Sequence, residues 1–347
     1  MPANAPGVNV SEAATARKTR PLEYLDVAVI GLGAIGAAHI DAVLKAPSVR
    51  LAAVVDVAPG RAAEVAASVG CEAYTSVADL LAGTNVDMAI IATPDALHLE
   101  AVREVAAAGK HILLEKPIAT SVEDARAILD IVERSDIKFT VGHCLRFDPK
   151  YAELRNRIKA GELGEIATLY ARRQNQVGVV ERLGGRVSSL LFLGVHDIDI
   201  VNWYMESPPV AVYCASSSKV MRAKGYDVDD VSFTTIRYAN GSLAVVESGW
   251  LLPPTYPRSG HFELVATGSR GLGRLDEFDE GLWVANENFR HIPLVDRLTP
   301  QVQHFAEAII NDEQPLISGP EALLAMEVAL AAELSAQENR EIPLPLR

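Results

Sequence analysis

A glycine-rich turn follows the first apolar run of the chain and reads Gly31-Leu32-Gly33-Ala34-Ile35-Gly36. This spacing is typical of turns that bind the pyrophosphate of a dinucleotide, because the glycines permit a tight turn, close approach of the backbone and close packing of the next helix. The start of that helix would offer free N–H groups to the phosphates. A glycine turn with a purely structural role is the alternative.

Asp56 stands about 20 residues beyond the turn, where the next apolar run ends. A carboxylate there would accept hydrogen bonds from the ribose hydroxyls of adenosine and would repel a 2′-phosphate. No arginine directly follows Asp56, although Arg61 lies near it. We therefore predict an NAD site and regard NADP as the less favoured cofactor. The predicted contacts in this part of the chain are Gly31, Gly33, Ala34, Ile35, Gly36 and Asp56.

Two further apolar runs end in polar residues, one in Thr93-Pro94-Asp95 with His98 downstream and the other in Glu115-Lys116-Pro117. Ligands of an open α/β sheet bind beyond the carboxyl ends of its strands. Thr93, Pro94 and His98 are therefore predicted to hold the ribose or nicotinamide side of the cofactor, with a helix cap as the alternative. Lys116 beside a nicotinamide could polarise a carbonyl or take part in proton transfer, whereas an ordinary solvated lysine is the alternative. The following proline restricts its backbone and can take the cis form.

A histidine and an aspartate interrupt the mostly apolar segment 191–203, where burying either side chain without a partner would be costly. His196 and Asp199 are three residues apart and share one face of the predicted helix. His196 suits proton abstraction from a hydroxyl, and Asp199 could orient its imidazole and raise its basicity. A structural histidine is the alternative.

The elements that must position these residues change character along the chain. From residue 24 to 142, short apolar runs alternate with helical stretches, which predicts a doubly wound parallel sheet. The predicted strands are 25–30, 51–56, 87–93, 111–116 and 138–142, and the predicted helices are 35–45, 61–69, 96–108 and 122–134.

The second half predicts an α+β unit with a large, mostly antiparallel open sheet. Asn240-Gly241 between two strand-like runs is a strong hairpin signal. The predicted strands are 166–176, 210–217, 231–238, 243–250, 262–267 and 282–285, and the predicted helices are 149–159, 189–205, 300–311 and 320–337. We divide the chain into a loose extension at 1–22, an NAD-binding unit at 23–145, and a unit at 146–347 for substrate binding and oligomerisation.

Composition excludes several classes of function. The 347 residues are 49% hydrophobic and 22% charged, as expected of a globular protein, and the net charge of −13 argues against nucleic acid as a partner. Cys71, Cys144 and Cys214 lack the spacing of a disulfide framework or a zinc site. We therefore expect that the protein resides in the reducing cytoplasm and binds no metal. No run reaches the ~18 apolar residues of a membrane helix.

Taken together, the motifs resemble those of the glucose-fructose oxidoreductase, inositol dehydrogenase and MocA family over residues 25 to about 345. The resemblance rests on the order and spacing of the glycine turn, Ala92-Thr93-Pro94 with His98, Glu115-Lys116-Pro117, Gly142-His143 with Arg146-Phe147, Gly194-Val195-His196-Asp197-Ile198-Asp199, and the helical ending after Gln314-Pro315.

The resemblance implies a Rossmann domain followed by a domain whose open sheet makes subunit contacts, in a homodimer or homotetramer. It implies hydride transfer between NAD(P) and a secondary alcohol of a sugar, nucleotide sugar or cyclitol. Lys116 and His196 would be the catalytic pair, Asp199 would assist, and Glu115 would lie near the nicotinamide. Lys116 and His196 would also contact the substrate, together with Arg172 and Asn175. Arg146 follows a predicted strand end and could bind a hydroxyl or a phosphate of the substrate, with a salt bridge to Asp148 or Glu153 as the alternative.

One departure concerns Phe192, because many sugar and inositol dehydrogenases of this family carry an aspartate at that position. Our hypothesis is an NAD-dependent oxidoreductase acting on a sugar, glycoside or cyclitol. A non-catalytic regulator that senses NAD and sugar on the same scaffold is the main alternative, and reduction of an imine or a tetrapyrrole is a further one.

Overall fold

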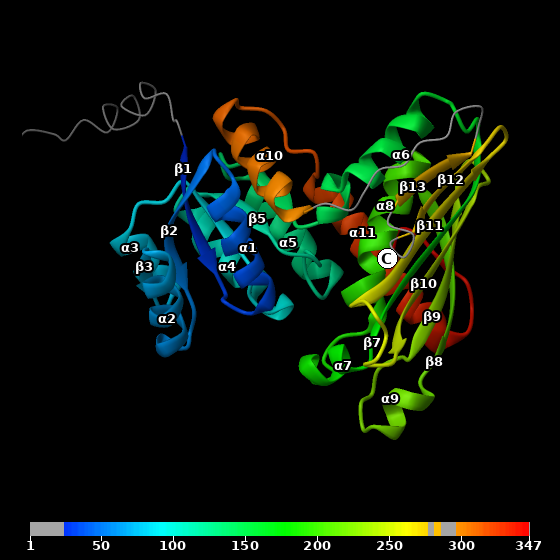
Figure 1. Ribbon diagram of the computed structural model, residues 1–347, viewed down its shortest axis with the longest axis horizontal. Coiled ribbons are helices and arrows are strands. Elements are labelled where there is room, and N and C mark those ends of the chain that lie inside the picture. The colour runs from blue at the N-terminus through cyan, green and yellow to red at the C-terminus, as the bar shows by residue number, and fades with distance from the viewer. Residues whose placement is uncertain (1–23, 277–280, 286–295, 347) are drawn as a thin grey trace, which may run out of the picture.

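The computed structural model describes residues 24–276, 281–285 and 296–346, with the backbone alone described for 281–285 (Figure 1). The predicted extension at 1–22 lies outside these residues. None of the helices in the described ranges is long and apolar enough to cross a membrane.

The first sheet is parallel and has the strand order β3-β2-β1-β4-β5-β6, which confirms the predicted doubly wound sheet. Its strands are β1 (Leu25–Ile30), β2 (Val49–Val55), β3 (Glu72–Tyr74), β4 (Met88–Ile91), β5 (His111–Leu114) and β6 (Phe139–Val141). Strand order reverses at β1 and β4, so the ends of these two strands border the crevice in which such sheets bind ligands. The short edge strand β3 lacks an apolar run and was not predicted.

Strands β4 and β5 end at Ile91 and Leu114, two residues before the predicted ends at 93 and 116. Pro94 and Pro117 follow closely, and a proline has no N–H to continue a strand ladder. Thr93 and Lys116 therefore lie just beyond the sheet. The helices of this unit are α1 (Ala34–Lys45), α2 (Pro59–Val69), α3 (Val77–Gly83), α4 (His98–Ala107) and α5 (Val122–Glu133). Helix α3 is short and was not predicted.

The second sheet has the order β13-β12-β11-β7-β10-β9-β8-β14 and is antiparallel except between β7 and β10, as predicted. Its strands are β7 (Ile166–Gln176), β8 (Pro209–Ser217), β9 (Val231–Tyr238), β10 (Leu243–Leu252), β11 (Gly260–Gly268), β12 (Leu272–Asp276), β13 (Gly281–Ala285) and β14 (Ile342–Pro343). Asn240-Gly241 joins β9 to β10, which confirms the predicted hairpin. The short strands β12 and β14 were not predicted.

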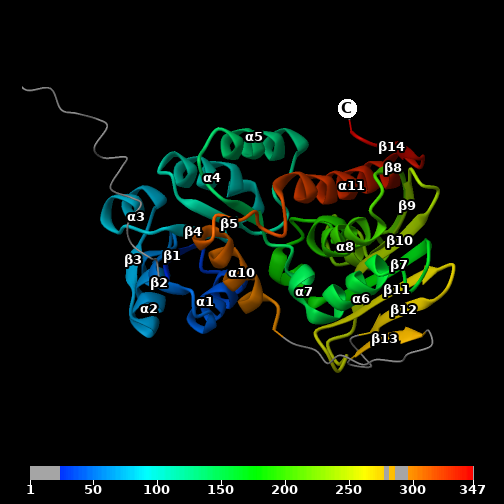
Figure 2. The same cartoon turned by 90° about the horizontal axis from the view of Figure 1, so that it is seen from above.

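Helices cover the face of the second sheet that is turned toward the first sheet (Figures 1 and 2). This covering layer consists of α6 (Pro149–Lys159), α8 (Val195–Met205) and α11 (Gly319–Glu338). The second unit also contains the short helices α7 (Gly178–Leu183) and α9 (Lys219–Ala223). The predicted helix 189–205 is in fact a π-helical turn at Leu190–Gly194 followed by α8. The short helices α7 and α9 were not predicted.

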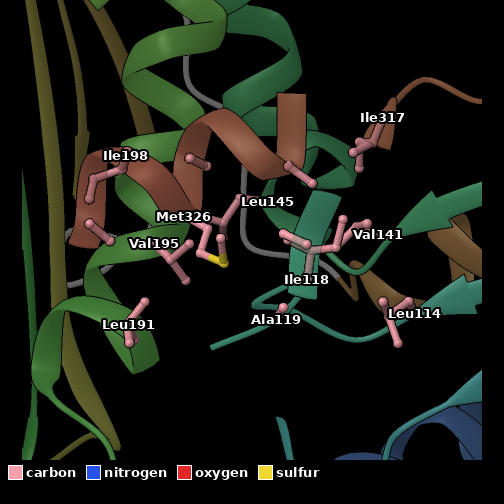
Figure 3. Packing of buried hydrophobic residues seen from close by; sticks show 14 of the residues in the cluster. Leu114, Ile118, Ala119, Val141, Leu145, Leu191, Val195, Ile198, Ile317 and Met326 are labelled. Atoms are coloured by element: carbon pink, nitrogen blue, oxygen red, sulfur yellow. The ribbon is translucent and has the colours of Figure 1, made fainter. Parts of the chain in front are cut away.

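A continuous apolar core joins the two units. Figure 3 shows Ile118 and Val141 of the first unit on one side and Val195 of α8 on the other, with Leu145 and Met326 packed between them. Helix α10 (Leu298–Ile310) lies on α1 and contributes to the core behind β1. The chain thus returns to the first unit between β13 and β14 of the second sheet, whereas the predicted division assigns all residues after 145 to the second unit.

Candidate active site

The glycine turn leaves room for a ligand at the start of α1. Gly31 has φ +91°, and a Cβ on it would stand 2.6 Å from the carbonyl oxygen of Ala92. A Cβ on Gly36 would stand 1.9 Å from the carbonyl oxygen of Gly31, so both positions require glycine. At Gly33, in contrast, a Cβ would meet nothing within 4 Å. Helix α1 begins there without a side-chain cap, and its first residues, Ala34 and Ile35, are exposed. Free N–H groups facing open space fit a pyrophosphate.

Asp56 is held beside this turn by backbone donors. Its Oδ2 accepts a hydrogen bond from Leu32 N at 3.0 Å and its Oδ1 accepts one from Ala58 N at 2.9 Å. Each carboxylate oxygen keeps a further acceptor site that a ribose hydroxyl could use. Arg61 lies against the same turn, where its Nε donates to the carbonyl of Leu32 at 3.3 Å. The arrangement fits a ribose with two free hydroxyls.

Thr93 and His98 differ in what they offer to a cofactor. The Thr93 hydroxyl is buried and has no partner within the described part of the chain, so it is available to a ligand group. His98 is fully buried, with its Nδ1 3.0 Å from the carbonyl of Pro117 and its Nε2 3.2 Å from that of Thr93. Its predicted cofactor contact is therefore corrected: the ring ties two strand-end loops together, and burial lowers its pKa.

Glu115 also faces the protein interior. Its Oε1 lies 2.7 Å from Nε2 of the fully buried His39 on α1, and its Oε2 accepts a hydrogen bond from Lys116 N at 3.0 Å. The carboxylate packs so closely on Gly142 that a Cβ there would stand 2.9 Å from Oε1. Burial alone would raise the pKa of Glu115, but His39 and Lys116 hold it below its usual value. The carboxylate is thus engaged within the protein, and the predicted position of Glu115 near the nicotinamide stays a prediction.

Lys116 connects the two units. Its Nζ donates to the carbonyl of Phe192 at 2.9 Å and lies 4.6 Å from the centroid of the Phe192 ring. Phe192 belongs to the π-helical turn, where the wider winding changes the helical hydrogen-bond pattern. Burial lowers the pKa of Lys116 while the charge of Glu115 opposes that change. The ammonium keeps two further N–H donors for a ligand.

His196 is the second residue of α8 and lies within electrostatic reach of Lys116. Burial of the ring, then the charges of Lys116 and Arg173, place its pKa well below the usual value, so the ring is neutral at physiological pH. Its Nδ1 is buried without a hydrogen-bond partner in the described ranges. A neutral imidazole beside an ammonium can take a proton from a hydroxyl that the ammonium binds.

Asp199 does not orient His196, contrary to the prediction. Its two oxygens accept hydrogen bonds from Arg146 Nε at 2.9 Å and Nη2 at 2.6 Å, and Arg146 also donates to Glu321 at 2.7 Å. Both members of the pair are fully buried. Arg146 is accordingly corrected from a substrate contact to a structural cation, because its guanidinium has been taken up by these carboxylates.

Sequence reasoning assigned no role to His143, which follows β6. The ring is 1% exposed, and neither nitrogen has a hydrogen-bond partner among the described residues. Nδ1 lies 4.0 Å from Asp199 Oδ2, and burial lowers the pKa of the ring although Asp199 opposes that change. The sequence signal that could have identified His143 is its position just after the end of β6, which pairs with β5.

Strand β7 shows which of its faces belongs to the site. Arg173 points toward α8, where it forms a two-bond ion pair with Asp197 at 2.6 and 3.0 Å. Arg172 points to the opposite, open face and donates to Glu247 at 2.9 Å. Its predicted substrate contact is therefore corrected, because neighbouring residues of a strand face opposite ways. Asn175 is two residues beyond Arg173, so the alternation of a regular strand places both on the same face. The substrate contact of Asn175 stays a prediction.

The fold and this arrangement define an oxidoreductase that binds NAD on a Rossmann domain. Residues 25–143 match the oxidoreductase family with NAD-binding Rossmann fold, and residues 151–272 match the GFO/IDH/MocA C-terminal domain. The chain belongs to the GFO/IDH/MocA family.

Curated relatives and solved structures agree with this assignment. Inositol 2-dehydrogenase of Rhizobium meliloti is 30% identical over 91% of this chain and 98% of its own length. The scyllo-inositol 2-dehydrogenase (NAD⁺) of Bacillus subtilis is 27% identical over 92% and 96%. The structure of scyllo-inositol dehydrogenase from Lactobacillus casei with bound NAD(H) and scyllo-inositol has the same fold, with a TM-score of 0.82 at 20% identity over 92% of this chain and 99% of that one.

Proposed function

We propose that the protein transfers a hydride between NAD and a secondary alcohol or ketone of a sugar, glycoside or cyclitol. The observation that carries this proposal is the hydrogen bond from Lys116 Nζ to the carbonyl of Phe192, which brings an ammonium of the first unit to the segment that bears His196. The names of the relatives, which are inositol dehydrogenases, support the same class of substrate.

In this proposal, residues 23–145 bind the cofactor and residues 146–347 supply most of the substrate site. The glycine turn would hold the pyrophosphate, Asp56 the adenosine ribose, and Thr93 a group nearer the nicotinamide. When bound, NAD supplies the carbon that accepts the hydride. Asp56 favours NAD over NADP because its charge opposes a 2′-phosphate.

His196 and Lys116 divide the chemistry at the reacting carbinol. As the C–H bond breaks and its electron pair leaves as hydride, the O–H proton passes to the neutral imidazole of His196. The C=O bond forms at the same carbon, and Lys116 donates a hydrogen bond to the oxygen while negative charge develops on it. Glu115 and His39 act as positioning residues because they fix the backbone at Lys116.

The test is a screen of sugars, glycosides and cyclitols with NAD and with NADP, followed as absorbance at 340 nm. We expect substrate-dependent reduction of NAD by at least one ring polyol. A protein that binds NADH yet reduces NAD with none of these compounds would contradict the proposal.

We also propose a cytoplasmic homodimer or homotetramer. Its support is the open face of the second sheet, where Tyr213 and Phe233 are 42% and 47% exposed on neighbouring strands, and the absence of any disulfide among the cysteines, all of which lie in the described ranges. Light scattering on the purified protein tests the assembly, and a monomer at micromolar concentration would contradict it.

A further inference from the structure

The side chain of Phe192 lies against the ammonium that is to bind the reacting oxygen. Lys116 Nζ is 4.6 Å from the ring centroid and is hydrogen-bonded to the carbonyl of the same residue. An oxygen accepting from a remaining Nζ donor lies about 3 Å from that nitrogen. Substituents of the substrate next to this oxygen therefore come within reach of the Phe192 ring.

The ring is the edge of a larger apolar cluster and not an isolated aromatic residue. Phe192 lies 6.2 Å, centroid to centroid, from the fully buried Trp250. The other members of the cluster are Val177, Val179, Val180, Leu183, Leu193, Met221, Tyr226 and Val228. Several of them come from α7 and the residue before it, so this short helix belongs to the apolar cluster on which the Phe192 ring packs.

The Phe192 ring itself offers no hydrogen-bonding group, and two polar groups near the cluster are already paired. The indole N–H of Trp250 donates to the carbonyl of Asp229 at 2.6 Å, and Arg173 is paired with Asp197. A substrate hydroxyl placed against Phe192 would leave water without gaining a partner from these groups, which is unfavourable. An apolar group in the same place would gain from burial. The geometry thus discriminates between substituents beside the reacting carbinol.

Resting on the proposed function, we infer that the substrate is a polyol ring bearing an apolar group, as in an aryl or alkyl glycoside, and that this group packs on Phe192. Lys116 and His196 act on a hydroxyl of the ring, while Phe192 selects the substituent. Phe192 is in this sense a specificity-determining residue for the reaction.

The first experiment compares matched substrates with the wild-type protein. One pair is phenyl β-D-glucopyranoside and D-glucose, and the other is a mono-O-methyl inositol and its parent inositol. We expect kcat/KM to be at least threefold higher for the substituted member of one pair or both. A smaller ratio in both pairs overturns the inference, while turnover of the unsubstituted compounds leaves the proposed function standing. Turnover of none of these four compounds, while another polyol of the screen reacts, overturns the inference alone, and turnover of no compound in the whole screen overturns both.

The second experiment assigns the preference to Phe192 with two substitutions of similar size. Phe192→Leu keeps an apolar side chain, so the variant should still prefer the substituted compound. Phe192→Asn should lower the ratio of kcat/KM between the substituted and the unsubstituted compound about tenfold or more, mainly through KM. Leu44→Asn, at an exposed position of α1, is the control and should leave the ratio unchanged. Equal ratios for the Leu and Asn variants would show that Phe192 does not select the substituent.

Discussion

The glycine turn and the α8 region use charge in opposite ways. At the turn, backbone N–H groups face open space beside Gly33, and Asp56 keeps acceptor sites free. Around α8, Asp197 and Asp199 are each taken up by a buried arginine, which leaves His196 without a carboxylate partner. A polar residue within a motif is therefore available for chemistry only if no neighbouring side chain in the fold already binds it.

Replacing Lys116, whose ammonium contacts the π-helical turn before α8, should have the largest effect. We expect Lys116→Ala to lower kcat by about 10³-fold, because the developing charge on the substrate oxygen loses its donor, while NADH binding stays measurable. Lys110→Ala is the control, since Lys110 stands just before the opposite end of β5 and donates to Asn85. Stopped-flow turnover and NADH fluorescence titration provide the measurements, and near-normal turnover would remove Lys116 from the mechanism.

The structural role of Asp199 can be separated from a catalytic one by unfolding. Asp199→Ala should lower the free energy of unfolding by about 3 kcal/mol, because it deprives the buried Arg146 of its two-bond partner. Asp130→Ala breaks an exposed pair with Arg134 and should cost less than about 1 kcal/mol. Urea denaturation measures both. An Asp199 variant of unchanged stability with a shifted pH–rate profile would instead support the original prediction.

The stability of the folded protein should depend on pH because three of its histidines are buried. Burial lowers the pKa of His98, His143 and His196 in the folded protein, so the unfolded chain binds more protons as the pH falls below about 6.5. Stability should therefore be full above that pH and decline below it. His143→Gln should reduce the slope by up to about 1.4 kcal/mol per pH unit. Denaturation curves between pH 7.5 and 5.5 test this, and an unchanged slope would contradict it.

The smallest effect is expected at Asp56, beside the glycine turn. Asp56→Ala should raise KM for NAD by about tenfold, because one charged hydrogen bond to the ribose is lost, and should narrow the discrimination against NADP. The exposed Asp130→Ala serves again as the control. Steady-state kinetics with both cofactors measure this. An unaltered ratio of kcat/KM for NAD to kcat/KM for NADP would show that Asp56 does not set the cofactor preference.

Much of the fold was predictable because its signals are local. The apolar runs located β1, β4 and β5, and the Asn240-Gly241 turn located the hairpin of β9 and β10. Short elements such as β3, α3 and α7 escaped because they hold too few residues for a periodic pattern. The return of α10 to the first unit was equally out of reach, since its apolar face fits more than one surface.

Local sequence was enough to locate the glycine turn, the positions of Thr93 and Lys116 after strand ends, and His196 on a buried helix, because each depends on residue type and spacing along a few neighbouring residues. Which carboxylates are free depends instead on the folded chain. Glu115 contacts His39, Asp199 pairs with Arg146, and Asp197 pairs with Arg173. The partners in each pair are at least 24 residues apart in the sequence. Such pairings depend on which charges folding brings within about 3 Å of each other, and no local pattern records that distance.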